Sequence, residues 1–311
     1  MLQVVTDPDL AGLEGLALGS VADWFTLLKP RVVTLVVFTG AVGLLVAPGH
    51  LHPLLAAITI LCIAVGAGAA GAINMWYDRD IDAVMRRTAS RPIPAGRIAA
   101  PEALSFGILL ACASVIVLAL ATNLAAGAML AVSILYYTVI YTAWLKRRTA
   151  QNIVIGGAAG AFPPLIGWLA VTGHFAVLPV LLCAIVFLWT PPHFWALSLF
   201  AHADYQRAGV PMLPVTRGAR VTRQHVFWYT LLLGAFSLSP WLLGYTGPIY
   251  GITAALLAAL FVYYAVRVLT DRQDSAGVSQ TRDKPAKVCF KYSISYLFIL
   301  FTALALDRLL G

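Results

Sequence analysis

Charged side chains are scarce in this chain of 311 residues. Asp, Glu, Lys and Arg make up 11% of the sequence, against about a quarter in ordinary soluble domains, whereas hydrophobic residues make up 60%. A soluble protein of this length has no means of burying so much apolar surface. The composition therefore argues against a soluble enzyme and predicts a polytopic membrane protein.

Cysteine is also rare. Cys62, Cys112, Cys183 and Cys289 are far apart in the sequence and form no CxxC pair. The pattern indicates neither a disulfide framework nor a zinc site, so we interpret the four as packing residues. A basic start is missing from residues 1–20, which predicts no cleaved signal peptide but a flexible cytoplasmic N-terminus followed by an uncleaved first span.

Long apolar stretches are what the chain has in abundance. A helix needs roughly 20 apolar residues to cross a bilayer. Nine stretches qualify, at about 27–47, 53–76, 103–122, 125–145, 153–172, 177–199, 226–244, 248–268 and 292–309. We predict an all-α fold, a membrane bundle of about nine transmembrane helices that forms a single domain over residues 21–311.

Basic residues are absent from every second connection between these spans. The segments near 48–52, 123–124, 173–176 and 245–247 contain no Lys or Arg, whereas the alternate segments contain 20 of the 21. Basic loops stay in the cytoplasm. The alternation predicts a plasma (inner) membrane protein with its N-terminus in the cytoplasm and its C-terminus outside. Function is expected on the cytoplasmic side, where the loops 77–102 and 200–225 are long.

Three aspartates follow the second predicted span, although the chain has only 13 acidic residues. Asn74, Asp78 and Asp82 are spaced by four, so they share one face of a helix, whereas Asp80 points elsewhere. Carboxylate and amide oxygens are ligands for Mg²⁺ rather than for zinc. These three residues, called here the Asn-Asp-Asp face, are therefore the predicted magnesium ligands.

Basic residues near this face suit a diphosphate group, because guanidinium groups bind phosphate oxygens that a metal leaves free. Lys146 and Arg147, at the end of the fourth predicted span, are close enough to the same membrane boundary to take part. The alternative is a solvated helix end whose charges only anchor the topology, as we expect for Arg148. The candidate ligands downstream of Asp82 are Arg86, Arg87 and Arg91.

A second polar group ends the sixth predicted span. Pro191 and Pro192 are expected to break the helix near the membrane boundary, where broken backbone must line protein or a cavity. His193 directly follows and fits a structural or a functional role equally well. The polar residues beyond it are Asp204, Tyr205 and Arg207.

The pattern G-x-G-x-x-G occurs at Gly66, Gly68 and Gly71. The dinucleotide-binding fingerprint requires a preceding strand, and here the glycines lie inside a predicted span. We interpret them as small residues that let two membrane helices approach closely.

Residues 74–94, NMWYDRDIDAVMRRTASRPIP, resemble the UbiA-type intramembrane prenyltransferases. They contain the N-x-x-x-D-x-x-x-D motif of that superfamily, and the longer form is similar to its haem-modifying branch, the protohaem IX farnesyltransferases or haem O synthases. Further similar segments are LKPR at 28–31, LKR at 145–147, TPPHFWAL at 190–197 and DYQRAGVPMLP at 204–214.

Two departures accompany this resemblance. Many members of the superfamily carry a second aspartate-rich motif after the sixth span, where this chain offers His193 and Asp204. In the quinone-type enzymes a tyrosine stands four residues before the lysine, whereas Tyr141 stands five residues before Lys146. Both departures fit the haem branch.

The resemblance implies that farnesyl diphosphate is the donor and haem b the acceptor, a substrate rather than a cofactor. Haem O and pyrophosphate would be the products, and the reaction would depend on Mg²⁺. The lipid bilayer is an expected partner, as is a downstream membrane enzyme that oxidises haem O; no nucleic acid is expected. The implied catalytic residues are Asn74, Asp78, Asp82, Lys146 and His193, and the implied substrate-binding residues are Arg86, Arg87, Arg91, Tyr141, Arg147, Asp204, Tyr205 and Arg207.

Three other functions stay open. A UbiA-type prenyltransferase acting on an aromatic or quinone precursor is disfavoured by the segments around His193 and Asp204. A transporter would need carboxylates deep within its spans, whereas these aspartates lie at one helix end. A non-catalytic haem-binding protein would release no pyrophosphate.

Overall fold

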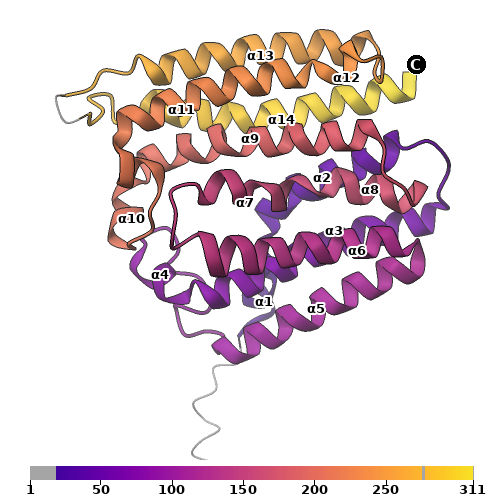
Figure 1. Cartoon of the computed structure of the whole chain (residues 1–311). Coiled ribbons are helices and arrows are strands. Elements are labelled where there is room, and N and C mark those ends of the chain that lie inside the picture. The colour runs from indigo at the N-terminus through magenta and orange to yellow at the C-terminus, as the bar shows by residue number, and fades with distance from the viewer. Residues whose placement is uncertain (1–18, 275–276, 311) are drawn as a thin grey trace, which may run out of the picture.

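The structure, a computed structural model, describes residues 19–274 and 277–310, so the expected flexible segment 1–20 falls almost wholly outside it. The described residues are mostly helical (Figure 1), and their only β-pairing is a single bridge between Gln273 and Ser279. The predicted all-α fold is confirmed. The helices are α1 (Val21–Leu27), α2 (Pro30–Val46), α3 (Pro53–Tyr77), α4 (Arg79–Val84), α5 (Ala100–Ala121), α6 (Leu124–Leu135), the π-helix η1 (Tyr136–Leu145), α7 (Asn152–Ala161), α8 (Pro163–Thr172), α9 (Val177–Phe200), α10 (His202–Arg207), α11 (Leu213–Ser237), α12 (Ser239–Leu242), α13 (Pro248–Leu269) and α14 (Lys284–Leu310).

Seven helices are long and apolar enough to cross a membrane, and the pair α1 and α2, bent by 52°, makes an eighth candidate. Two of the seven are composite, because α6 continues into η1 and α7 into α8. The remaining predicted span, 226–244, corresponds to the second half of α11 and to α12. The basic first half of α11 lowers the hydropathy of this helix, but the helix packs along α9 and α13 (Figure 1). The predicted bundle of about nine spans is therefore confirmed. Proline in the first turn, where its missing N–H costs no helical bond, begins several of the helices: α2, α3, α8 and α13.

The glycines of α3 allow the α1–α2 junction to lie directly against this helix. A Cβ at Gly68 would lie 3.0 Å from Leu28 Cβ, and a Cβ at Gly71 would lie 3.3 Å from Lys29 Cδ. Close helix packing, as interpreted from the sequence, is confirmed at these positions. One consequence is that Lys29 reaches the last turn of α3.

The predicted break at Pro191 and Pro192 is wrong, because α9 continues through both prolines to Phe200. Both prolines are buried among neighbouring helices, and the Thr190 hydroxyl donates to the carbonyl of Val186 at 3.0 Å. Packing and Ser or Thr side chains of this kind allow a proline to remain inside a membrane helix.

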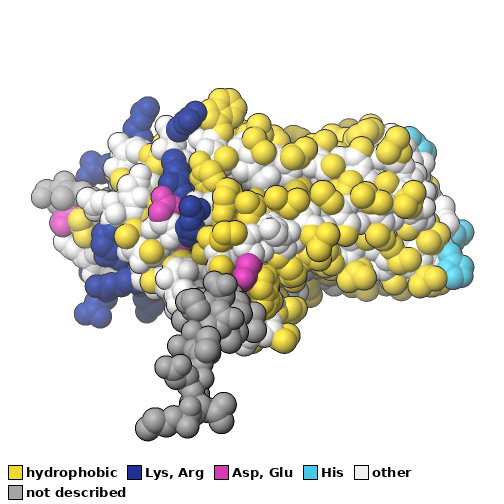
Figure 2. All heavy atoms as spheres, turned by 90° about the horizontal axis from the view of Figure 1, so that it is seen from below, with side chains coloured by type: hydrophobic (Ala, Val, Ile, Leu, Met, Phe, Trp, Pro, Cys, Tyr) yellow, Lys and Arg dark blue, Asp and Glu magenta, His cyan; other side chains and the backbone are white. Residues whose placement is uncertain are grey.

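The bundle has two chemically distinct ends. Figure 2 shows Lys and Arg gathered at one end, histidines at the other, and a broad hydrophobic band between them. The basic end carries α4 and α10 (Figure 1), which come from the two segments predicted as long loops, 77–102 and 200–225. These two segments pack together through a buried apolar cluster that includes Ile81, Met85, Tyr205, Val210 and Met212.

Candidate active site

The Asn-Asp-Asp face lies where α3 passes into α4. The backbone N–H of Asp78 donates to the carbonyl of Asn74 at 2.9 Å, and that of Asp82 donates to the carbonyl of Asp78 at 2.8 Å. The helical spacing thus continues across the junction, and the three side chains share one face as predicted. Asn74, Asp78 and Asp82 are 3%, 0% and 2% exposed. They therefore face neither lipid nor bulk solvent.

Each member of this face has a cationic partner. Lys146 forms an ion pair with Asp78, Arg91 donates to Asp82 at 2.5 Å, and Lys29 Nζ donates to Asn74 Oδ1 at 2.6 Å. Two carboxylates thus meet three cations from three separate segments. A cluster of basic side chains in a buried place favours binding of an anion.

Lys29 was not predicted as a site residue, although it belongs to the LKPR segment of the resemblance and contributes to the basic pattern of the N-terminal side. It lies between α1 and α2 in a left-handed conformation, with φ 51° and ψ 52°. Such a backbone conformation is uncommon for a residue other than glycine and often marks a functional position. A lysine directly before the proline of a predicted span was the available signal.

Arg147 joins the end of η1 to the α3–α4 junction. Its guanidinium binds both carboxylate oxygens of Asp80 at 2.7 Å and lies 4.9 Å from the centre of the Tyr77 ring. This hydrogen bonding holds the pKa of the Asp80 carboxyl below its usual value. Asp80 itself is 60% exposed, so it points away from the Asn-Asp-Asp face, as predicted. Arg147 also approaches Asp78 Oδ1, at 3.8 Å.

The face offers oxygen donors of the kind that Mg²⁺ prefers, but too few to fill its coordination without further ligands. Asp78 Oδ1 is buried and has no hydrogen-bond partner, so one hard oxygen is available. Within residues 19–274 and 277–310, no group of three or more His, Cys, Asp or Glu side chains converges on a point suitable for a metal. Mg²⁺ is commonly held by one or two carboxylates together with substrate phosphates and water. The residues present fit that mode and not an all-protein cage.

The remaining arginines of the first segment are placed differently. Arg86 and Arg87 are exposed, and no ion pair involves them in the described part of the chain. Tyr205 is buried beside α4; burial raises the pKa of its hydroxyl, and the nearby Arg87 opposes that shift. The structure therefore brings Arg91 into the site and leaves Arg86 and Arg87 exposed.

In the part of the chain that the structure describes, no hydrogen bond or ion pair joins the second polar group to the Asn-Asp-Asp face. Asp204 forms an ion pair with Arg207 one turn later on α10. His193 stacks between Trp189 and Phe290, with ring centres 4.3 and 4.6 Å away, and its Nδ1 lies 2.6 Å from the Ser293 hydroxyl. The ring is 9% exposed.

Tyr141 belongs to the packing of η1. Its ring stacks on Tyr137, with centres 5.5 Å apart. Gly156 of α7 leaves the space for it, because a Cβ there would lie 2.1 Å from Tyr141 Cδ2. The ring is thus held by the helix that follows η1.

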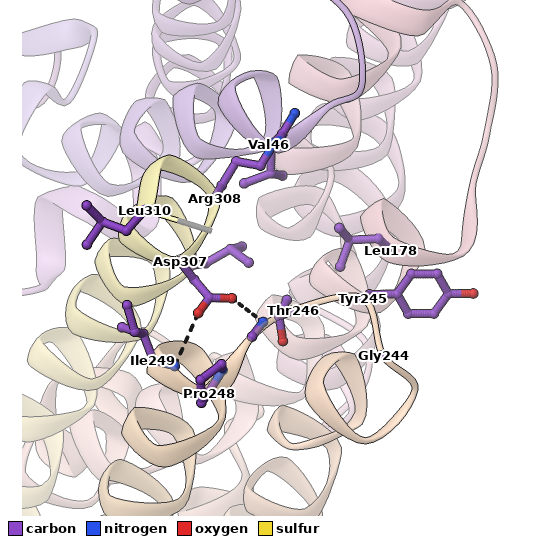
Figure 3. Close-up of a pocket in the computed structure, with 12 residues that line it drawn as sticks. Val46, Leu178, Gly244, Tyr245, Thr246, Pro248, Ile249, Asp307, Arg308 and Leu310 are labelled. Carbon is purple, nitrogen blue, oxygen red and sulfur yellow. Dashed lines mark hydrogen bonds between the residues drawn. The ribbon is translucent and has the colours of Figure 1, made fainter.

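A cavity of about 390 Å³ lies at the end of the bundle opposite the basic one. Its lining comes from the α12–α13 connection and the end of α14 (Figure 3). The Asp307 carboxylate is already used there, since it accepts from the backbone N–H groups of Gly247 and Ile249 at the start of α13. This cavity is separate from the Asn-Asp-Asp face.

The chain is similar to known proteins over most of its length. Residues 36–288 match the UbiA prenyltransferase family. Protoheme IX farnesyltransferase of Granulibacter bethesdensis is 63% identical over 306 residues, 98% of this chain and 96% of that protein. The enzyme of the same name from Acidiphilium cryptum is 64% identical over 303 residues, 97% of this chain and 96% of that protein.

Solved structures show the same fold at low sequence identity. A digeranylgeranylglyceryl phosphate synthase superposes with a TM-score of 0.75 at 19% identity, covering 94% of this chain and 99% of the other. A UbiA homologue from Archaeoglobus fulgidus bound to DMAPP and Mg²⁺ superposes with a TM-score of 0.63 at 17% identity, covering 90% and 99%. The chain is thus a multi-pass membrane protein and belongs to the UbiA prenyltransferase family.

Proposed function

We propose that this protein transfers the farnesyl group of farnesyl diphosphate to a vinyl group of haem b, with consumption of one water, and releases haem O and pyrophosphate. The observation that carries the proposal is the buried Asn-Asp-Asp face with its surrounding cations, which suits a metal-bound diphosphate. The relatives named above supply the identity of the acceptor and of the prenyl chain.

Asn74, Asp78 and Asp82 would hold Mg²⁺, which would neutralise charge on the diphosphate as it leaves. The UbiA homologue from Archaeoglobus fulgidus shares this fold and was solved with DMAPP and Mg²⁺ bound, which supports that assignment. Lys146 and Arg91 form ion pairs with the carboxylates of the face, and both can instead donate N–H hydrogen bonds to phosphate oxygens. When the allylic C–O bond breaks, its electron pair stays on the diphosphate, and these preorganised cations stabilise the added charge.

The location and orientation follow from the charge distribution. The basic end in Figure 2 carries the Asn-Asp-Asp face, and basic segments remain on the cytoplasmic side of a membrane. We infer an inner-membrane protein with the N-terminus and the site on the cytoplasmic side and the C-terminus outside. Haem O with its farnesyl chain is too apolar to leave into water, so an enzyme that oxidises it further is expected to be a membrane partner.

The single most informative experiment is incubation of the purified protein in lipid nanodiscs with haem b, farnesyl diphosphate and Mg²⁺. Mass spectrometry should detect haem O, with pyrophosphate released in equal amount. An aromatic acceptor offered instead of haem should remain unmodified. Prenylation of that acceptor without haem O would support the quinone-type alternative, and absence of pyrophosphate would favour a transporter or a non-catalytic haem-binding protein.

His193 is the residue we assign to haem, because it lies within a stack of flat aromatic rings about two turns before the end of α9. We expect His193→Ala to raise the KM for haem b about tenfold, the equivalent of one net hydrogen bond. The KM for farnesyl diphosphate should change little. Steady-state kinetics with each substrate varied in turn checks this.

His225→Ala is the matched control for His193. His225 likewise contacts an aromatic ring, that of Trp195, but edge-on, and its Nδ1 lies 2.9 Å from the carbonyl of Val221 in its own helix. The substitution His225→Ala should lower stability without a selective effect on the KM for haem b. Equal changes of both KM values in His193→Ala would argue against a role in binding haem.

A further inference from the structure

The fourth span ends in an unusual helix. The π-helix η1 covers ten residues, Tyr136–Leu145, whereas such helices mostly occur as single turns, often at functional sites. Its five-residue backbone bonding is visible where the Lys146 N–H donates to the carbonyl of Tyr141 at 2.8 Å. In the same segment the side-chain hydroxyl of Thr142 donates to the carbonyl of Tyr137 at 2.8 Å. The winding therefore differs from α-helical winding over the whole segment that leads into the site.

The five-residue separation of Tyr141 and Lys146 matches this bonding, because the backbone N–H of Lys146 donates to the carbonyl of Tyr141. In η1 five residues make one hydrogen-bonded turn, and Lys146 can pair with Asp78 while Tyr141 remains packed against Gly156. The same turn brings the Thr142 hydroxyl to α3.

Thr142 contacts the Asn-Asp-Asp face directly. It is 0% exposed, and its oxygen accepts from Asn74 Nδ2 at 3.0 Å. The second N–H of the same amide donates to Asp78 Oδ2 at 2.7 Å, and the amide oxygen accepts from Lys29 at 2.6 Å. Both amide donors are thus used, and the Thr142 hydroxyl proton is directed away by its bond to Tyr137. Only one of the two orientations of the Asn74 amide satisfies all these bonds.

We propose that Thr142 is a positioning residue, which η1 places so that it fixes the orientation of the Asn74 amide and thereby the direction in which its oxygen faces. The inference rests on the proposed function of the Asn-Asp-Asp face as the site of Mg²⁺ and diphosphate. Without the Thr142 oxygen, one buried N–H of Asn74 loses its acceptor, and only the bonds to Lys29 and Asp78, two groups that a metal-bound diphosphate would engage, still orient the amide. Residues that orient a metal ligand in this way usually change affinity by about 10- to 100-fold when they are removed.

The test compares Thr142→Val, which keeps the shape and removes the hydroxyl, with Thr142→Ser, which keeps the hydroxyl. Binding of Mn²⁺ is measured by electron paramagnetic resonance in the presence of the unreactive analogue farnesyl thiodiphosphate, so that no turnover is needed. We expect Thr142→Val to weaken Mn²⁺ binding about tenfold. Thr142→Ser should bind Mn²⁺ as the unchanged protein does, and the KM for haem b should stay the same in both.

Thr138→Val is the control on the same helix, because the Thr138 hydroxyl donates only to the carbonyl of Ile134. It should leave Mn²⁺ binding unchanged. If Thr142→Val does not insert stably, Thr142→Ala replaces it with the same expectation. Unchanged Mn²⁺ binding in the hydroxyl-free variants, or equal loss in Thr142→Ser, would overturn the positioning role alone. Failure of the unchanged protein to bind Mn²⁺ with the analogue would overturn the proposed function as well.

Discussion

Asp78→Asn should lower the rate of haem O formation by about a thousandfold or more. The Asp78 side chain is fully buried, one of its oxygens pairs with Lys146, and the other has no hydrogen-bond partner. The change replaces a carboxylate metal ligand by a neutral amide and so weakens the hold on the metal and on the leaving group, and loss of one such electrostatic interaction already costs about 10²- to 10³-fold. Single-turnover assays by mass spectrometry measure the rate.

Asp80→Asn is the matched control, since it makes the same chemical change two residues away on another face. Asp80 is mostly exposed and pairs with Arg147, and an exposed ion pair contributes about 0–1 kcal/mol, or at most about fivefold in rate. Comparable losses in the two variants would show that the effect comes from the charge of the junction and not from a site on the Asn-Asp-Asp face.

Lys146→Met should impair both stability and turnover. It leaves the Asp78 carboxylate buried without its closest cation, and breaking a buried ion pair on one side costs about 3–5 kcal/mol. Turnover should fall about a hundredfold or more, because a phosphate-binding cation is also lost. Unfolding in detergent, followed by circular dichroism, and the haem O assay measure the two effects.

The double variant Lys146→Met with Asp78→Asn separates these effects. It removes both charges of the pair, so stability should largely return whereas activity should not. Arg148→Met, at the neighbouring exposed basic residue, should affect neither. Recovery of activity in the double variant would refute a direct role of either residue in catalysis.

Local sequence patterns were sufficient to predict most of the fold. The spans follow from runs of apolar residues, which are visible without any partner, and their bounds agree with the helices to within a few residues at most ends. The predicted break at Pro191 and Pro192 was wrong because its outcome depends on packing from helices remote in sequence. The π-helical winding of η1 was equally out of reach, since its sequence, YYTVIYTAWL, also suits an α-helix.

The residues of the candidate site likewise divide into those that sequence spacing could group and those that only the packing of helices brings together. Asn74, Asp78 and Asp82 could be grouped from their spacing because they belong to one continuous helical path. Lys29 and Thr142 could not, since each reaches Asn74 from a different helix and only the packing of α3 against the α1–α2 junction and η1 brings them together. The roles given to these residues and to His193 stay predictions that the experiments above address.

The pairing of Lys146 and Arg91 with the two carboxylates has a thermodynamic consequence. Without ligands, these internal counterions compete with a divalent ion for the same oxygens, so Mg²⁺ alone should bind weakly. A diphosphate offers the two cations new partners and releases the carboxylates, and linkage requires that each ligand then strengthens the other's binding by the same factor. The protein should therefore bind the metal ion and the prenyl diphosphate cooperatively, and it should retain little metal when no substrate is present.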